Sequence, residues 1–226
     1  MRFARQTWTV AGKDLRSELR TKESLNASIS FAVVILVLFS FAVDPTADQM
    51  REMSGGLLWL VFSFAGALIL NRSFARELGN DCLDALVASP VSPAALFLGK
   101  AFANYVLLLL VELVTLPIFG VLYNTQWARQ PAMLAAVMLP ATWGMTVIGT
   151  IFSALTVNLR MRELMLPVII YPMMIPVLMA AMRLSTILIN GEAIPADDWI
   201  WFKLIIGFDI IFTSLSLALV EVVLVG

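Results

Sequence analysis

Six long apolar runs constrain the fold of this chain more than any other feature. Each run is close to the roughly 20 apolar residues that a helix needs to cross the hydrocarbon core of a membrane. The runs are continuous rather than alternating, which argues against transmembrane strands. We therefore expect an all-α polytopic membrane protein with six transmembrane helices, at about 27–43, 55–71, 97–121, 132–157, 164–182 and 203–225.

The composition excludes several classes of function. Of the 226 residues, 60% are hydrophobic and 14% are charged, whereas a soluble domain is about half apolar and a quarter charged. Six spans leave only short connections, so residues 1–226 form a single transmembrane domain without a separate catalytic domain. The sequence has no histidine, which excludes histidine-dependent catalysis, and its single cysteine, Cys82, cannot form an intrachain disulfide. A net charge of -1 gives no indication of nucleic-acid binding.

The distribution of lysine and arginine predicts how the chain crosses the membrane. Eleven of the 15 lie before the first span or in the second and fourth connections, and four lie on the other side. Positive residues in short flanks favour the cytoplasm. We therefore expect both termini to be cytoplasmic, with only four basic residues on the outer side: Arg51, Arg129, Arg183 and Lys203.

The first 26 residues form a cytoplasmic segment with an amphipathic pattern. As a helix, residues 3–22 would carry Trp8, Ala11, Leu15 and Leu19 on one face and basic residues on the other, which is typical of a helix lying in the membrane interface. A plain basic anchor would also explain the charges, but not the apolar stripe. The following apolar run of about 17 residues is long for a signal peptide, so we expect it to remain as the first span.

Residues 72–96 form the second cytoplasmic connection and carry the clearest functional signal. Apolar residues recur there every four positions, with charged residues on the other faces, which predicts an amphipathic helix over 74–88. Ser92 and Pro93 are a good N-cap and first residue for the next span. The helix could lie flat on the bilayer or dock a cytoplasmic partner, and its acidic face favours docking. The residues expected to dock are Phe74, Glu77, Leu78, Cys82, Leu83, Asp84, Leu86 and Val87.

Proline is unevenly distributed among the spans. Pro167, Pro172 and Pro176 all lie in the fifth. Because proline removes a backbone donor, we expect this helix to be bent or broken and to face protein or a water-filled cavity. Residues 183–189 are too short for another span, so with the stretch up to Asp198 they could form a re-entrant or interfacial element on the outer side.

Two carboxyl residues fall inside predicted spans. Lys100 marks the inner boundary of its span, and Glu112 lies 12 residues or about 18 Å further along the helix, which leaves about 12 Å to the outer boundary of a roughly 30 Å core. Asp209 lies six residues, or about 9 Å, inward from Lys203 at the outer boundary. Both would therefore lie at a similar depth in the outer half of the membrane. Ionisable residues are expensive there and are functional candidates. They could line one polar cavity, be neutral and hydrogen-bonded between helices, or face different partners.

The sequence contains no phosphate-binding loop of the Walker form. Around Gly99 and Lys100, the required first glycine is replaced by Ala94 and the required hydroxyl residue by Ala101. The chain is therefore not expected to be an enzyme. If transport is driven by ATP, the nucleotide binds to another polypeptide, and the helix over 74–88 is the natural place to receive its motion.

Two stretches of the chain resemble the heme exporter protein B (CcmB) family, the membrane subunits of an ATP-binding-cassette (ABC) transporter in cytochrome c maturation. One is RELGNDCLDALVASPVSPAALFLGKAFANY, from Arg76 to Tyr105, and the other is ALTVNLRMRELMLPVIIYPMMIPVLM, from Ala154 to Met179. Ser-Pro pairs are weak signals singly, but their order and spacing together are specific. The resemblance covers nearly the whole chain.

This resemblance implies a bacterial inner-membrane permease subunit of the ABC-2 or type V exporter kind, with the coupling helix described above. It also implies a separate ATPase subunit similar to heme exporter protein A, a heme-handling protein C, a small D subunit and a second copy of this chain. Heme would be the substrate rather than a resident cofactor. Without histidine, axial ligation would fall to methionines or to Tyr105, Tyr123, Tyr171 and Cys82, which argues against tight heme coordination by this chain.

Two other functions are compatible with the same sequence. One is an ABC-2 permease that moves a lipid, a glycan or a drug, because architecture does not identify the substrate. The other is a membrane assembly scaffold that transports nothing. Loss of c-type cytochromes on deletion would favour the heme-related function, and ATPase activity that depends on this subunit would argue against a pure scaffold.

Overall fold

A computed structural model describes residues 2–43, 48–74, 91–156 and 162–225. In these parts of the chain every regular element is helical. The elements in chain order are α1 (Arg2–Thr21), α2 (Glu23–Ala42), α3 (Asp48–Asn71), α5 (Pro93–Leu122), the 3₁₀ helix η3 (Trp127–Arg129), α6 (Pro131–Thr156), α7 (Arg162–Ile189), the 3₁₀ helix η4 (Ala196–Asp198) and α8 (Trp199–Val225).

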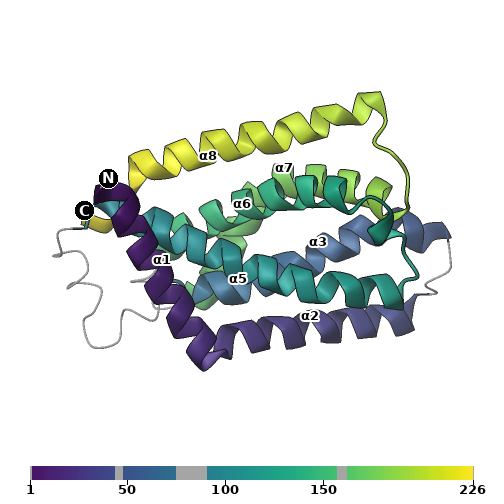
Figure 1. The fold of residues 1–226 in the computed structure, drawn as a ribbon, viewed down its shortest axis with the longest axis horizontal. Helices are drawn as coiled ribbons and strands as arrows, with labels where there is room; N and C mark the ends of the chain where they lie inside the picture. The colour runs from purple at the N-terminus through teal and green to yellow at the C-terminus, as the bar shows by residue number, and fades with distance from the viewer. Residues whose placement is uncertain (1, 44–47, 75–90, 157–161, 226) are drawn as a thin grey trace.

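Six of these helices are long and apolar enough to cross a membrane: α2, α3, α5, α6, α7 and α8. Each contains one of the six apolar runs of the sequence. The prediction of an all-α protein with six membrane-spanning helices is therefore confirmed. The six helices run side by side, and α1 lies across one end of the bundle, beside both chain termini (Figure 1).

A sharp turn at Lys22 separates the crossing helix α1 from the spanning helix α2. Lys22 has φ 55°, in the left-handed region, so the chain changes direction at one residue between the two helices. The side chain of Glu18, which is buried, accepts a hydrogen bond from the backbone N–H of Leu25 at 3.0 Å. This bond satisfies one of the free amides at the start of α2.

The buried face of α1 differs from the predicted apolar stripe. Ala11 is buried and Leu15 is half-buried, but Trp8 and Leu19 are exposed. The inward face instead carries Val10, Ala11, Asp14 and Glu18, at helical spacing. Exposed Trp8 and Leu19 do not contradict a stripe that faces the membrane interface. The face of α1 that is buried against the bundle was not predicted, and it includes two carboxyl groups, Asp14 beside Lys100 of α5 and Glu18 at the start of α2.

Four helices form the centre of the bundle, and two flank it. The largest core cluster is built mainly from α3, α5, α6 and α7, whereas α2 and α8 are mostly exposed along their spans. In Figure 1, α2 and α8 lie on opposite edges of the bundle. Tyr123 fastens α2 to this core, because its hydroxyl donates to the Leu36 carbonyl at 2.7 Å.

Small and hydroxyl residues allow α3 and α7 to approach closely. A Cβ at Gly55 would collide with the Met182 carbonyl and with Thr186. The Gly55 amide donates to Thr186 Oγ1 at 3.2 Å, and Trp59 Nε1 donates to Ser185 Oγ at 2.9 Å. Close backbone approach with hydrogen bonds between helices is a common way to join helices in a membrane.

The fifth span, α7, is one continuous helix despite its three prolines, so of the two alternatives predicted there, a bend or a break, the break is wrong. Pro167 borders a cavity of about 10 Å³ between α3, α6 and α7. This is at the lower limit for one water molecule, so the helix packs against protein there. Residues 183–189 continue α7 rather than forming a separate outer element, which corrects that expectation as well.

Candidate functional site

A buried lysine near the start of α5 organises one end of the bundle. Lys100 is 1% exposed. Its Nζ lies 3.1 Å from Asp14 Oδ2 of α1 and donates to the Ser73 carbonyl at 2.9 Å, just after α3. The same Nζ lies 4.8 Å from the centre of the Phe74 ring. A buried charge needs such partners, since its desolvation is costly.

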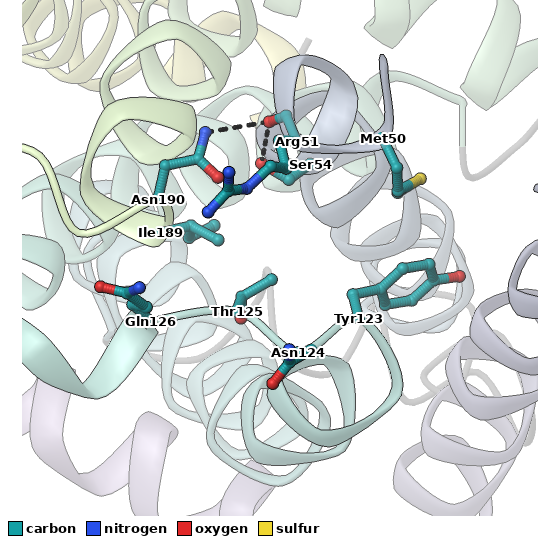
Figure 2. A pocket seen from close by; sticks show the side chains of 9 residues that line it. All are labelled: Met50, Arg51, Ser54, Tyr123, Asn124, Thr125, Gln126, Ile189 and Asn190. Atoms are coloured by element: carbon teal, nitrogen blue, oxygen red, sulfur yellow. Dashed lines mark hydrogen bonds between the residues drawn. The ribbon is translucent and has the colours of Figure 1, made fainter. Parts of the chain in front are cut away.

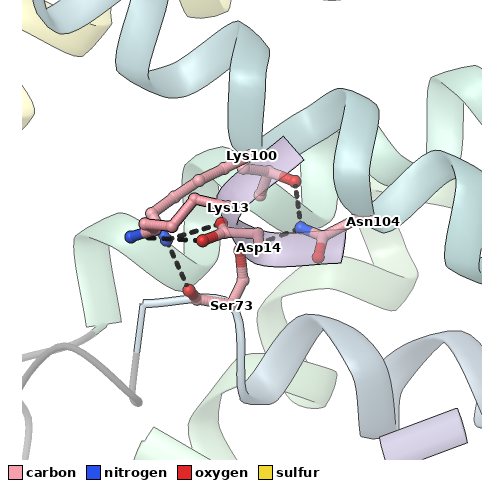
Figure 3. A network of polar contacts seen from close by, with 6 residues as sticks. Lys13, Asp14, Ser73, Lys100 and Asn104 are labelled. Carbon is pink, nitrogen blue, oxygen red and sulfur yellow. Dashed lines mark hydrogen bonds and ion pairs between the residues drawn. The ribbon is translucent and has the colours of Figure 1, made fainter. Parts of the chain in front are cut away.

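This polar network extends from α1 to α6 (Figure 3). Asn104, one turn after Lys100, donates through Nδ2 to Ser73 Oγ at 2.9 Å and to Thr150 Oγ1 at 3.0 Å. We call Asp14, Ser73, Lys100, Asn104 and Thr150 the Lys100 network. It connects α1, α5 and α6 with Ser73, which together with Phe74 directly precedes segment 75–90.

The Lys100 network was not foreseen from the sequence. Lys100 served there as a reference point for depth in the membrane and in the comparison with a Walker loop, and Asp14 was given no role. A lysine with seven apolar or glycine neighbours before it in the same helix, Pro93 to Gly99, was the available signal. Such a lysine must either reach the helix end or find a buried partner.

Of the predicted docking residues, only Phe74 falls in the described residues. It is fully buried, beneath Lys100 and against Ala154 of α6, so it lies inside the bundle rather than on a surface. Ser92, on the other side of the segment, caps α5 by accepting from the Ala95 amide at 3.3 Å. The remaining predicted residues lie outside the described residues: Glu77, Leu78, Cys82, Leu83, Asp84, Leu86 and Val87.

Glu112 is bonded between two helices in the middle of α5. It is 1% exposed, and its Oε1 accepts from Thr142 Oγ1 of α6 at 2.7 Å. Its other oxygen, Oε2, is buried and has no hydrogen-bond partner among the described residues. Of the three arrangements considered from the sequence, a bond between helices describes Glu112.

Asp209 of α8 faces α6 at nearly the same height along the α6 axis as Glu112 does. Its Oδ1 is buried and has no hydrogen-bond partner in the described part of the chain. A Cβ at Gly144 would lie 2.6 Å from this oxygen, so Gly144 leaves the space that the carboxyl occupies. Thr142 and Gly144 are two residues apart on α6, or about 3 Å along the axis. The similar depth expected for Glu112 and Asp209 is therefore observed.

Glu112 and Asp209 approach α6 from different sides. Residues two apart on a helix point about 200° apart, so Thr142 and Gly144 direct Glu112 and Asp209 to different sides of α6. A cavity of about 340 Å³ adjoins Glu112 and is otherwise lined by apolar residues and a tryptophan of α5, η3 and α6, and Asp209 is not among its lining residues.

A polar pocket of about 130 Å³ lies at the bundle end opposite the Lys100 network. Residues from the start of α3 and the end of α7 form one side, and residues 123–126, between α5 and η3, form the other (Figure 2). From its place in the sequence, Arg51 was assigned only to the outer side of the membrane. The pocket is lined by Met50, Arg51, Ser54, Tyr123, Asn124, Thr125, Gln126, Ile189 and Asn190.

The side chains considered as heme ligands are dispersed. Tyr123 is buried at the end of α5 with its hydroxyl bonded to α2, and Tyr171 lies on α7. Tyr105, on α5, packs edge-on against Trp143 with ring centres 5.5 Å apart. Cys82 lies outside the described residues. Among the described residues, no group of three or more His, Cys, Asp or Glu side chains is arranged to hold a metal ion.

The bundle and its polar clusters define a polytopic α-helical membrane protein of the permease type. Residues 5–221 match the family described as CcmB protein. The chain therefore belongs to the CcmB family, as its sequence motifs indicated.

Curated relatives of the chain share its length as well as its sequence. The chain is similar to heme exporter protein B of Rhodobacter capsulatus, with 30% identity over 74% of this chain and 76% of the relative. It is also similar to heme exporter protein B of Pseudomonas aeruginosa, with 31% identity over 70% of each chain. The protein of the same name from Escherichia coli is 24% identical over 43% of this chain and 44% of its own length.

Proposed function

We propose that this chain is the membrane-spanning permease subunit of an ATP-driven heme exporter that serves cytochrome c maturation. The observation that carries this proposal is the family match over residues 5–221, which includes all six candidate spans apart from the last few residues of α8. The relatives that align over most of this chain are named heme exporter protein B.

The proposed location is the bacterial inner membrane, with both termini in the cytoplasm. Eleven of 15 lysines and arginines support this orientation. The termini lie at the same end of the bundle as the Lys100 network (Figure 1). That end would face the cytoplasm, and the end with the polar pocket would face outward.

A division of labour among subunits follows from the motifs that this sequence lacks. Because it has no Walker loop, ATP would be hydrolysed by a separate subunit similar to heme exporter protein A. A heme-handling protein C, a small D subunit and a second copy of this chain would complete the complex, surrounded by membrane lipids. Heme is then a substrate or the cargo of a partner, and the chain holds no cofactor of its own.

The Lys100 network supports a route by which the ATPase subunit could move the permease. Segment 75–90 begins directly after Phe74, whose ring lies against Lys100, and ends two residues before the α5 cap Ser92. Both ends of the segment are therefore attached to the same part of α5. A displacement of the segment would reach α5 directly and α1 through Asp14.

The docking part of the proposal is tested by Leu86→Asp. A charge in the apolar stripe of a docking helix costs contacts and desolvation, so we expect co-purification of the ATPase subunit to fall about tenfold, a change of about 1.4 kcal/mol. Asn80→Asp adds the same charge to the polar face and is the matched control. Equal co-purification of both variants, at normal protein levels, would indicate instead that the helix lies on the membrane surface.

Deletion of the gene tests the function itself. We expect loss of c-type cytochromes with normal heme synthesis, restored by the full chain. Normal c-type cytochromes would point to a permease for another substrate. ATPase activity that is independent of this subunit would point to an assembly scaffold.

A further inference from the structure

We propose that the polar pocket between α3, α5 and α7 binds an oxyanion, the carboxylate or phosphate group of an amphiphile at the outer face of the membrane. The only charged side chain that lines the pocket is Arg51. Arg51 forms no ion pair within the described residues. A guanidinium group in a pocket without a carboxylate is suited to a planar or tetrahedral oxyanion.

A neutral side chain of the pocket offers a donor as well. The Gln126 Oε1 accepts from Arg129 Nη1 at 3.3 Å, which leaves the Gln126 amide nitrogen as its available donor. Gln126 is exposed and lines the pocket, so a ligand can reach this nitrogen. The Thr125 hydroxyl oxygen, in contrast, is buried and is not open to the pocket.

The pocket walls are held in place by bonds between its elements. Asn190 Nδ2 and Ser54 Oγ both donate to the Arg51 carbonyl, at 3.0 and 2.8 Å. The Gln126 amide donates to the Ile189 carbonyl at 2.9 Å. The loop after α5, the end of α7 and the start of α3 are therefore fixed to one another before a ligand arrives, which reduces the entropic cost of binding.

Two amphiphiles could supply such a group at this position. A volume of about 130 Å³ admits a head group and not a porphyrin or a lipid chain, so the apolar body of the ligand would lie outside the pocket. One source is a heme propionate, and this source rests on the proposed heme-export function. The other is the phosphate of an anionic phospholipid, which does not depend on that function.

The test measures binding to the purified full-length chain in a non-ionic detergent. Quenching of tryptophan fluorescence gives the affinity for heme and for its dimethyl ester, which has no carboxylates. Native mass spectrometry gives the retention of phosphatidylglycerol relative to phosphatidylcholine. We expect the wild-type chain to prefer at least one charged probe by about tenfold, because a hydrogen bond to a charged group contributes this much.

Two variants and one control show whether the preference for a charged probe arises in the polar pocket. Arg51→Gln should abolish it, and Gln126→Leu, which keeps the charge but removes the amide donor, should reduce it several-fold. Lys203→Gln removes one exposed outer-end charge on α8, away from the pocket, and should leave it unchanged.

Each outcome bears on the site directly. If Arg51→Gln loses only the preference for heme over its dimethyl ester, the site binds a carboxylate. If it loses only the preference for phosphatidylglycerol over phosphatidylcholine, the site binds a phosphate, and the proposed export function is not affected. The proposal is overturned if the wild-type chain prefers neither charged probe, if both pocket variants bind like wild type, or if Lys203→Gln acts as strongly as Arg51→Gln.

Discussion

At the scale of single residues, Lys100 is a buried lysine whose charge must be compensated by its neighbours. Its ammonium group is buried, and it depends on an Asp14 side chain that is 23% exposed. A partly solvated partner still compensates the charge, because the Ser73 carbonyl and the Phe74 ring complete its surroundings. Removing the lysine leaves these groups without their donor, and removing Asp14 leaves a buried charge less compensated.

Lys100→Met should therefore destabilise the chain by about 2–3 kcal/mol, toward the lower end for breaking a buried ion pair by removing one partner. Lys13→Met is the matched control, since Lys13 also pairs with Asp14, at 3.2 Å, but its side chain is 49% exposed. An exposed pair contributes less than about 1 kcal/mol. Thermal unfolding in detergent measures both variants, and equal effects would contradict the importance of burial.

The hydrogen bond between Glu112 and Thr142 is expected to contribute less stability than the Lys100–Asp14 ion pair. Glu112→Gln keeps an oxygen for the Thr142 hydroxyl, so it should change unfolding little and leave cytochrome c maturation intact. Glu112→Leu removes the bond and should cost about 0.6 kcal/mol, the average for a hydrogen bond between membrane helices. Thr142→Val should cost a similar amount, and the double variant should add nothing.

The opposite result for Glu112 would be informative. If Glu112→Gln impairs maturation while protein level and complex assembly stay normal, the charge of Glu112 has a role in transport that the Thr142 bond does not explain. The buried Oε2 without a described partner would then be the atom to examine.

At the scale of elements, the contact of α1 with α5 depends on one glycine. A Cβ at Gly99 would lie 2.7 Å from Val10 Cβ and 2.8 Å from the Thr7 carbonyl. These atoms belong to the body of α1, so a side chain at position 99 must push the helix away. The Lys100–Asp14 pair lies directly beside this contact.

Gly99→Val should therefore detach α1 from α5 and expose it to protease. We expect trypsin to cleave after Arg16 and Arg20 at least about tenfold faster than in wild type, because local opening that costs about 1.4 kcal/mol less is tenfold more populated. Gly207→Val is the control, since nothing lies within 4 Å of a Cβ there. Unchanged cleavage of Gly99→Val would show that α1 adapts without leaving α5.

The sequence predicted which elements form more reliably than which faces they bury. Hydropathy identifies the six spans because each depends only on local composition. The inward face of α1 was not predicted, because its carboxyl group Asp14 has a partner 86 residues away, Lys100 on α5. Likewise, proline predicts a weakened helix, but neighbouring helices keep α7 continuous.

The polar sites were predicted in part for the same reason. An intramembrane carboxyl such as Glu112 stands out in any apolar run, whereas Thr142 is an unremarkable residue until the fold brings it to Glu112. The pocket around Arg51 is assembled from the start of α3, the loop after α5 and the end of α7, so no local sequence pattern predicts it.

At the scale of the whole molecule, α5 connects all three polar clusters. Lys100 lies near its start, Glu112 lies in its middle, and the loop that follows it lines the polar pocket. Its 30 residues would span about 45 Å. An element of this length, continuous with segment 75–90 at one end, is suited to carry a displacement from one end of the bundle to the other.

The direction of this connection depends on topology, which Cys82 can report because it is the only cysteine in the chain. If segment 75–90 is cytoplasmic, an impermeant maleimide should not label Cys82 in intact cells and should label it after permeabilisation. A second variant, Cys82→Ser with Asn124→Cys, moves the single cysteine to the exposed rim of the polar pocket and should give the reverse result. Labelling of Cys82 from outside would invert the membrane orientation and with it the side to which the ATPase subunit could bind.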